Sequence, residues 1–184
     1  MFKENHMGEL VYMTSDVIKL PHAFSTRYGG VSEGIYESLN FSSNIGDEQE
    51  KVEENYRRFA KIFGANDDEC ATTKQVHGVE VRVCDYSDRH VLGTPVPYEA
   101  DGLITDKKGM PLFCFTADCV PALLCDAENK IAAAVHCGWR SSVGDILKIT
   151  VEKMERLGAK RENICCAMGA AIGFCCFETH NDVP

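Results

Sequence analysis

Two histidines and one cysteine, each beside the end of an apolar segment, are the residues of this sequence best suited to chemistry. They are His77 in KQVHG, Cys119 in TADCVP and His136 in AVHCGWR. Two imidazoles and one thiolate suit zinc, and three protein ligands leave a fourth position open for water or a substrate. These residue types predict a catalytic zinc site assembled from three separate segments, with the same three residues taking part in the chemistry.

The spacing of the three residues does not by itself distinguish a metal site from other arrangements. They lie far apart in the sequence and follow neither a CxxC nor an HExxH pattern. One alternative is a core cysteine with two hydrogen-bonded histidines. Another is a Cys-His hydrolase in which Cys119 is the nucleophile, activated by His136 or His77. Spacing alone leaves both alternatives open.

Two amphipathic helices are predicted among the elements that must position these residues. Apolar residues recur at helical spacing over residues 47–64, where Asp47 and Glu50 form a capping-box-like pattern. The same spacing over residues 141–158 predicts a second helix, directly after the GWR motif, with Ser142 as its N-cap. A glycine ends each pattern.

Apolar runs predict the strands that carry the candidate ligands. Cys119 comes directly before one such run and His136 lies near the end of another. Side chains at strand ends are both rigidly held and accessible. The predicted strands, which make the protein a mixed α and β structure, cover residues 79–84, 111–115, 120–125, 130–137 and 163–168.

The composition predicts one globular domain spanning residues 1–184. Of the 184 residues, 45% are hydrophobic, which is enough for a core. The sequence shows neither a secretory signal nor a run long enough to span a membrane, so we expect a cytoplasmic protein. Most of the ten cysteines are expected to be reduced core residues. The formal net charge of -9 argues against a nucleic-acid partner.

Seven motifs follow one another along the chain: FSTRYGGVSEG, LNFSSNIGDE with EENYRRF, KQVHG, EADGLITD, TADCVPALLCD, AAVHCGWR and GAAIGFCCFE. In content and order they resemble those of the YfiH family, also called the laccase-domain or polyphenol oxidase family. This resemblance implies metal ligands at His77, Cys119 and His136. It also implies an α+β fold, a layered α/β/β/α sandwich with mixed sheets and helices outside.

The activity implied by the resemblance is that of a purine nucleoside phosphorylase. It would act with phosphate on adenosine, inosine and S-methyl-5'-thioadenosine, with adenosine deamination as a side activity. The partners would be a purine nucleoside and phosphate, and the oligomeric state is left open. Members of the family continue for several tens of residues beyond the CCFE-like motif, so residues 1–184 are expected to lack the family's C-terminal segment.

Several residues near the motifs are candidates for handling such a substrate. Asp118 is a candidate general acid or base, or a partner for a metal-bound histidine, and otherwise a strand-end cap. For phosphate, the candidates are Arg140, Ser141 and Ser142, because they precede a predicted helix whose amides favour an anion. Their alternative is a plain N-cap and a surface charge. Arg27 in TRYGG is another phosphate candidate, since neighbouring glycines allow close approach.

Asp101 occupies a position of the family-like EADGLITD motif and is expected to orient a glycine turn. Copper is the alternative metal, because cysteine and histidine also bind it. A copper-dependent polyphenol oxidase needs many more histidine ligands than the six in this chain, of which the remaining four have no comparable setting: His6, His22, His90 and His180.

Overall fold

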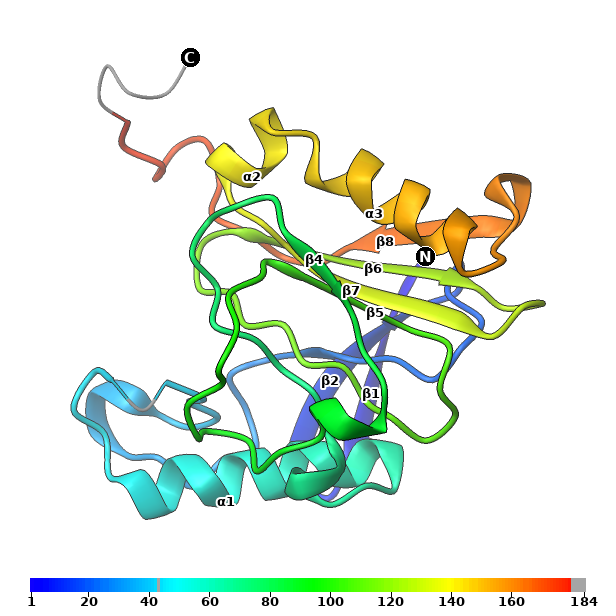
Figure 1. Cartoon of the computed structure of the whole chain (residues 1–184). Helices are drawn as coiled ribbons and strands as arrows, with labels where there is room; N and C mark the ends of the chain where they lie inside the picture. The colour runs from blue at the N-terminus through cyan, green and yellow to red at the C-terminus, as the bar shows by residue number, and fades with distance from the viewer. Residues whose placement is uncertain (43, 180–184) are drawn as a thin grey trace.

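Two β-sheets packed against each other form the centre of the molecule, and helices lie outside them (Figure 1). The computed structural model describes residues 1–42 and 44–179. One apolar cluster joins helix α3 (Ile146–Arg156) to the larger sheet, and another joins helix α1 (Gln49–Ala60) to the smaller one. A third cluster lies between strands of the two sheets. The α/β/β/α layering expected from the sequence is confirmed.

The larger sheet carries most of the candidate ligands. It has the order β4-β5-β7-β6-β8, with β4 and β5 parallel and the other neighbours antiparallel. In the β6–β7 pair, Val120 lies opposite Cys137 and Pro121 opposite His136. The start of β6 and the end of β7 therefore meet at one edge of the sheet. The strands are β4 (Val81–Val83), β5 (Gly102–Thr105), β6 (Val120–Asp126), β7 (Ile131–Cys137) and β8 (Ile164–Met168).

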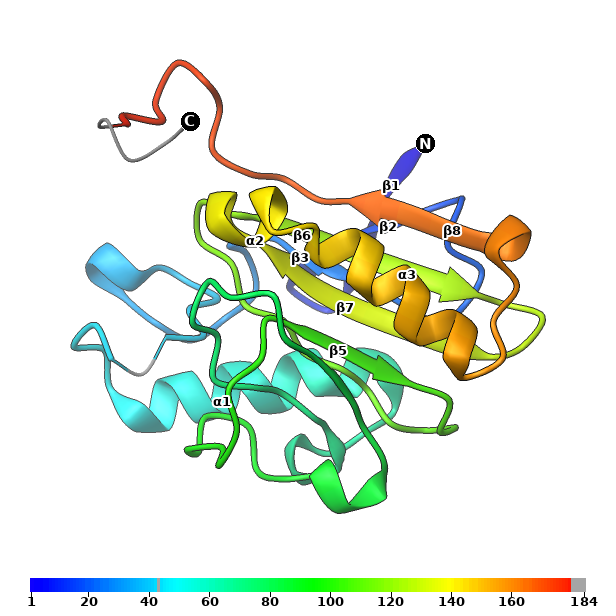
Figure 2. The same ribbon diagram turned by 45° about the horizontal axis from the view of Figure 1, so that its top comes forward.

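The smaller sheet is an antiparallel meander of β1 (Phe2–Met7), β2 (Leu10–Ser15) and β3 (Phe24–Ser25). It lies between the larger sheet and α1 in Figure 1, whereas in the turned view of Figure 2 most of it is seen behind the larger sheet. No helix in the described part of the chain has the length and apolar character that a membrane span requires. Short 3-10 helices occupy Gly34–Tyr36, Lys61–Phe63, Asp67–Glu69, Tyr86–Asp88 and Arg161–Asn163.

The first predicted helix is present, but its capping is different. α1 begins at Gln49, and its N-cap residue Glu48 makes no side-chain cap. The predicted capping box is absent because the Asp47 carboxylate instead accepts hydrogen bonds from Ser32 Oγ at 2.6 Å and Asn40 Nδ2 at 2.8 Å. These bonds hold the loop before α1. Asp47 therefore contacts residues distant in the sequence instead of capping the helix.

The second predicted helix is divided in two. α2 covers Trp139–Val143 and α3 begins at Ile146, with Asp145 between them in a left-handed conformation at φ 64°. Ser142 therefore lies inside α2 and is not an N-cap, which corrects the prediction. Gly144 lies so close to Val79 that a Cβ at that position would come within 2.4 Å of the valine side chain. The close packing of Gly144 against Val79 thus occurs at the point where the predicted helix divides into α2 and α3.

The strand predictions hold for β6, β7 and β8 and fail in part elsewhere. The segment 111–115 forms no strand and pairs only through an isolated bridge from Leu112 to Ala71. Its Phe113 is buried among the aromatic rings near α1, so the apolar run serves packing instead of pairing. The predicted strand over 79–84 is shortened to β4.

All ten cysteines are free thiols, but their burial differs from the prediction. Four are buried and two are half-buried, whereas Cys165 and Cys166 on β8 and the pair at 175–176 are exposed. The exposure of the β8 cysteines corrects the expectation of core positions. It follows from the place of β8 at the edge of the sheet, where side chains have fewer neighbours.

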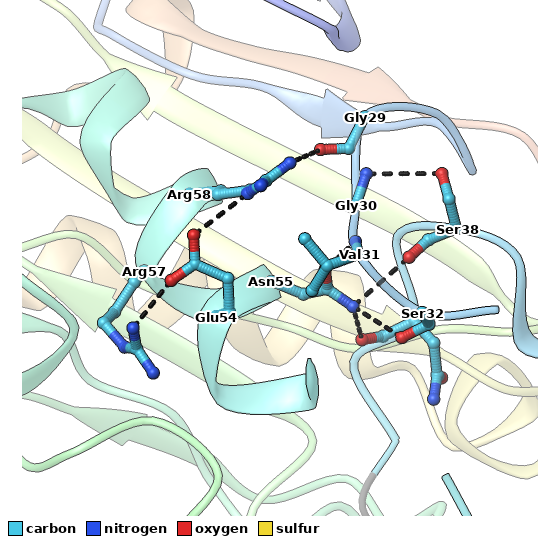
Figure 3. A network of polar contacts seen from close by, with 10 residues as sticks. Gly29, Gly30, Val31, Ser32, Ser38, Glu54, Asn55, Arg57 and Arg58 are labelled. Atoms are coloured by element: carbon cyan, nitrogen blue, oxygen red, sulfur yellow. Dashed lines mark hydrogen bonds and ion pairs between the residues drawn. The ribbon is translucent and has the colours of Figure 1, made fainter. Parts of the chain in front are cut away.

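A buried polar network attaches the loop after β3 to α1 (Figure 3). Asn55 of α1 is fully buried, and its Oδ1 accepts the Val31 N–H at 2.8 Å. Its Nδ2 donates to Ser32 Oγ at 2.9 Å and to the Asn40 carbonyl at 2.8 Å. Arg58 adds a bond to the Gly29 carbonyl at 3.1 Å. The network holds the loop that carries Arg27.

Replacing Asn55 with alanine is expected to lower the free energy of unfolding by about 1–3 kcal/mol, because buried backbone groups lose their partners. Urea unfolding followed by circular dichroism measures the change. Asn163→Ala is the matched control, since its side chain bonds Glu128 at the surface. Equal effects of the two substitutions would contradict this role.

Candidate metal centre

The structure brings His77, Cys119 and His136 together. One donor atom from each lies within 4.8 Å of the other two. Cys119 Sγ is 3.8 Å from His77 Nε2, and the two imidazole rings lie edge to face with centroids 4.7 Å apart. Three donors facing a common point are the arrangement that a tetrahedral metal with one open position requires.

Two sheet strands and one loop position these side chains. Cys119 directly precedes β6, and His136 is next to last in β7, so the antiparallel register places both at one sheet edge. His77 comes from the loop before β4 and is exposed, whereas His136 is 3% exposed. The backbone of His77 has φ 58°, an unfavourable region for a residue other than glycine. Such strain concentrates at functional sites.

Asp101, just before β5, connects the loop and the strand. Its buried carboxylate accepts Nδ1 of His136 at 2.8 Å and the backbone amides of Val76, His77 and Gly78 at 2.7 to 3.1 Å. Burial opposes ionisation, but the hydrogen bonds from His136 and the three amides outweigh it and lower the pKa of Asp101. The contacts of Asp101 with residues 76–78 agree with its expected role of orienting a glycine turn. The sequence analysis did not predict its bond to His136.

Asp118 lies on the exposed side of the site, next to Cys119. The histidine partner expected there is supplied by Asp101 instead, since Asp101 bonds His136 Nδ1. The sequence signal for Asp101 was an acidic residue directly before a buried strand, in the motif EADGLIT. Nothing local to that motif indicates which histidine it meets, because the two are brought together by the pairing of β5 with β7.

Burial raises the pKa of the Cys119 thiol, and the nearby charges of Asp118 and Asp101 raise it further. A nucleophilic cysteine requires the opposite, a lowered pKa that yields thiolate near neutral pH. A bound cation would stabilise the thiolate and reverse this tendency. The raised pKa therefore argues against a free thiolate nucleophile at Cys119.

The residues after Gly138 form the first turn of α2 beside the centre. Arg140 is exposed, and its guanidinium lies over the Trp139 ring, 4.3 Å from its centroid. Ser142 is exposed, whereas Ser141 is fully buried and its Oγ has no hydrogen-bond partner among the described residues. Arg140 and Ser142 are thus exposed residues of α2, whereas Ser141 is not.

Arg27 is exposed in the loop that follows β3. Its guanidinium donates two hydrogen bonds to the Glu37 carbonyl, at 2.6 and 3.1 Å. It lines a shallow hollow of about 330 Å³ whose lining includes none of the three candidate ligands. Of the other histidines, His22 and His90 bond backbone groups, His6 pairs with Glu4, and His180 lies outside the described residues.

Gly138 touches all three candidate ligands. Its backbone angles, φ -68° and ψ 165°, suit any residue, so space is what requires glycine. A Cβ at this position would lie 2.8 Å from the His77 ring, 3.5 Å from Cys119 Sγ and 3.6 Å from the His136 ring.

Gly138→Ala is expected to displace the His77 ring and weaken zinc binding roughly tenfold, as a misplaced ligand does. A competition titration with a chromophoric chelator measures the affinity. Gly173→Ala is the control, because a Cβ there meets only Cys175 Sγ at an ordinary 3.5 Å. Unchanged affinity in the Gly138 variant would contradict the placement of zinc among the three donors.

Comparison with known proteins adds independent information. A family model described as "Multi-copper polyphenol oxidoreductase laccase" matches residues 21–184. A Deinococcus radiodurans protein named "Purine nucleoside phosphorylase" is 40% identical over 90% of this chain and 62% of its own length. "Adenosine deaminase RL5", from an unknown prokaryotic organism, is 35% identical over 88% of this chain and 63% of its own length.

Solved structures match the fold. YlmD from Geobacillus stearothermophilus has a TM-score of 0.87 and 28% identity, over 97% of this chain and 68% of the other. The Bacillus licheniformis protein YfiH has a TM-score of 0.74 and 27% identity, over 91% and 61%. This chain thus spans less than two thirds of the length of the two relatives named above.

Proposed function

We propose that this chain, which belongs to the YfiH-like family whose model is described as multi-copper polyphenol oxidoreductase laccase, is a zinc-dependent purine nucleoside phosphorylase. Its substrates are adenosine, inosine and S-methyl-5'-thioadenosine with phosphate, and it deaminates adenosine as a side activity. The observation that carries the proposal is the cluster of His77, Cys119 and His136 donors within 4.8 Å. The names of two relatives, a phosphorylase and a deaminase, support the reaction.

The donor set fits zinc. Two imidazoles and a thiolate are borderline-soft ligands, and the exposed face of His77 leaves the centre accessible. A zinc ion held there would supply a Lewis acid that polarises a substrate heteroatom or activates water. Copper accepts the same donors and stays the alternative metal, with polyphenol oxidation as the alternative reaction.

The chain's own residues then bind and orient the substrates. Arg140 and Ser142, exposed at the start of α2, hold the phosphate, and Arg140 keeps its place through the Trp139 ring. Ser141 is proposed as a third phosphate-binding residue of the same turn, with its buried Oγ as the donor. Asp118, exposed beside Cys119, acts as general acid toward the leaving purine.

Arg27 is proposed as a second phosphate-recognition residue. Arg27 lines a surface hollow together with Ser38 and Asn40, and its guanidinium is suited to bidentate phosphate contacts. We further propose that residues 1–184 form one family domain that works in the cytoplasm without a nucleic-acid partner, in keeping with the net charge of -9.

Metal analysis combined with a turnover assay tests the proposal. The purified chain is analysed by mass spectrometry for metals and incubated with adenosine, with and without phosphate. We expect about one zinc per chain and adenine release that depends on phosphate, with some inosine from deamination. Copper with phenol oxidation would favour the alternative, and a chain with neither metal nor turnover would contradict the proposal.

A further inference from the structure

We propose that Asp101 is the positioning residue of this centre: its carboxylate sets the tautomer of His136 and the backbone conformation of His77 together, and so controls zinc affinity. The inference rests on the metal centre of the proposed function. Asp101 lies one position before β5 and is 1% exposed, so it contacts no substrate and acts only through the two histidines.

Each oxygen of the Asp101 carboxylate has two partners. Oδ1 accepts the His136 Nδ1 at 2.8 Å and the His77 N–H at 2.9 Å. Oδ2 accepts the Gly78 N–H at 2.7 Å and the Val76 N–H at 3.1 Å. The residue is also held by its backbone, since its carbonyl accepts the His136 N–H at 2.7 Å. One buried carboxylate thus ties a loop to a strand of the sheet.

The bond to His136 decides which ring nitrogen faces the metal. Because an ionised carboxylate only accepts, Nδ1 must carry the proton. Nε2 then keeps its lone pair and is the ring nitrogen left to bind the metal. Carboxylate partners of this kind fix the ring of metal-bound histidines and raise the basicity of the ligating nitrogen.

The bonds to the loop decide where His77 stands. Three consecutive amides, from residues 76 to 78, converge on the carboxylate, which is the pattern of a backbone anion nest. His77 adopts φ 58° at its centre, a conformation that costs free energy without such support. The charge of Asp101 therefore stabilises the strained backbone that presents the exposed ligand.

Asp101→Asn separates charge from size. An asparagine has the same shape, but its NH2 group must face two donors whichever way the amide is turned. If the NH2 group faces His136, the ring can accept only by moving its proton to Nε2, and that nitrogen then has no lone pair for the metal. If it faces the loop, the amides of Val76 and Gly78 lose their acceptor.

Asp126→Asn is a matched control. Asp126 is also fully buried and accepts backbone amides of Glu128, Asn129 and Lys160 at 2.8 to 3.1 Å. It ends β6, whereas Cys119 precedes that strand. At about 3.3 Å per residue, the control lies roughly 20 Å from the centre. Both substitutions therefore disturb a buried carboxylate, and only one disturbs the ligands.

Zinc affinities of the metal-free parent and both variants, measured against a chromophoric chelator, test the proposal. We expect Asp101→Asn to raise the Kd about 10- to 100-fold, and Asp126→Asn to leave it within about twofold. A Kd for Asp101→Asn within twofold of the parent would overturn the proposal. Equal weakening in the two variants would also overturn it, because the effect would then be one of general stability.

A second measurement observes the parent chain and so does not need the Asp101→Asn variant to fold. Side-chain 15N NMR of the zinc-loaded protein reports each ring nitrogen, with the His136 signals assigned by their loss in His136→Gln. We expect the proton on Nδ1 and the metal on Nε2. Zinc on Nδ1, or a His136 ring without a proton there, would overturn the proposal.

These outcomes separate the inference from the proposed reaction. Zinc binding that depends on Asp101, without phosphorolysis, would support the positioning role and contradict the phosphorylase. A parent chain that binds no zinc would contradict the metal centre on which both depend.

Discussion

Cys119→Ala is expected to abolish zinc binding and phosphorolysis together. The thiolate is the single sulfur donor of the three-residue cluster, and its loss leaves two histidines, too few ligands to hold zinc. The zinc Kd should rise by more than about 100-fold, beyond the effect of losing an outer partner. Metal analysis after dialysis and adenine release from adenosine with phosphate measure the two effects.

The fold should survive this substitution, because Cys119 is only half-buried and precedes β6 instead of packing within it. Circular dichroism of the metal-free variant checks this. Cys165→Ala is the control, since that thiol is exposed on β8, and it should keep both zinc and turnover. Full activity of the Cys119 variant would remove the basis for the proposed site.

Arg140→Ala is expected to raise the phosphate KM by roughly 10- to 100-fold, the effect of losing a charge-assisted bond of about 1.5–3 kcal/mol. The zinc content should stay unchanged, because Arg140 is not among the donors. Initial rates at several phosphate concentrations and saturating adenosine measure the change. A lowered kcat with an unchanged phosphate KM would place Arg140 in another role.

Arg57→Ala controls for the loss of a surface arginine. Arg57 pairs with Glu54 on α1, which lies on the opposite side of the molecule from α2 (Figure 1). Its replacement should leave the phosphate KM within about twofold of the parent, as expected for a surface ion pair. An equal rise in both variants would indicate a general charge effect on an anionic substrate.

The elements that the sequence predicted well have a clear local pattern. α1 buries residues at helical spacing, and β6 and β7 are apolar runs whose residues are all buried or half-buried, so all three lie close to their expected positions. The predictions failed where distant segments compete with local preference. Asp47 accepts hydrogen bonds from Ser32 and Asn40 instead of capping α1. Phe113 packs with aromatic rings instead of pairing in a sheet.

The donor types, the family and the motifs that contain the ligands can be read from the amino-acid sequence, since they depend on residue identity and order. The fold was needed to find that Asp101 joins His77 to His136, because the pairing of β5 with β7 brings together positions 35 residues apart. The fold also shows that the helix after GWR breaks at Asp145. Such contacts depend on which faces of the packed layers meet, and no local pattern encodes that choice.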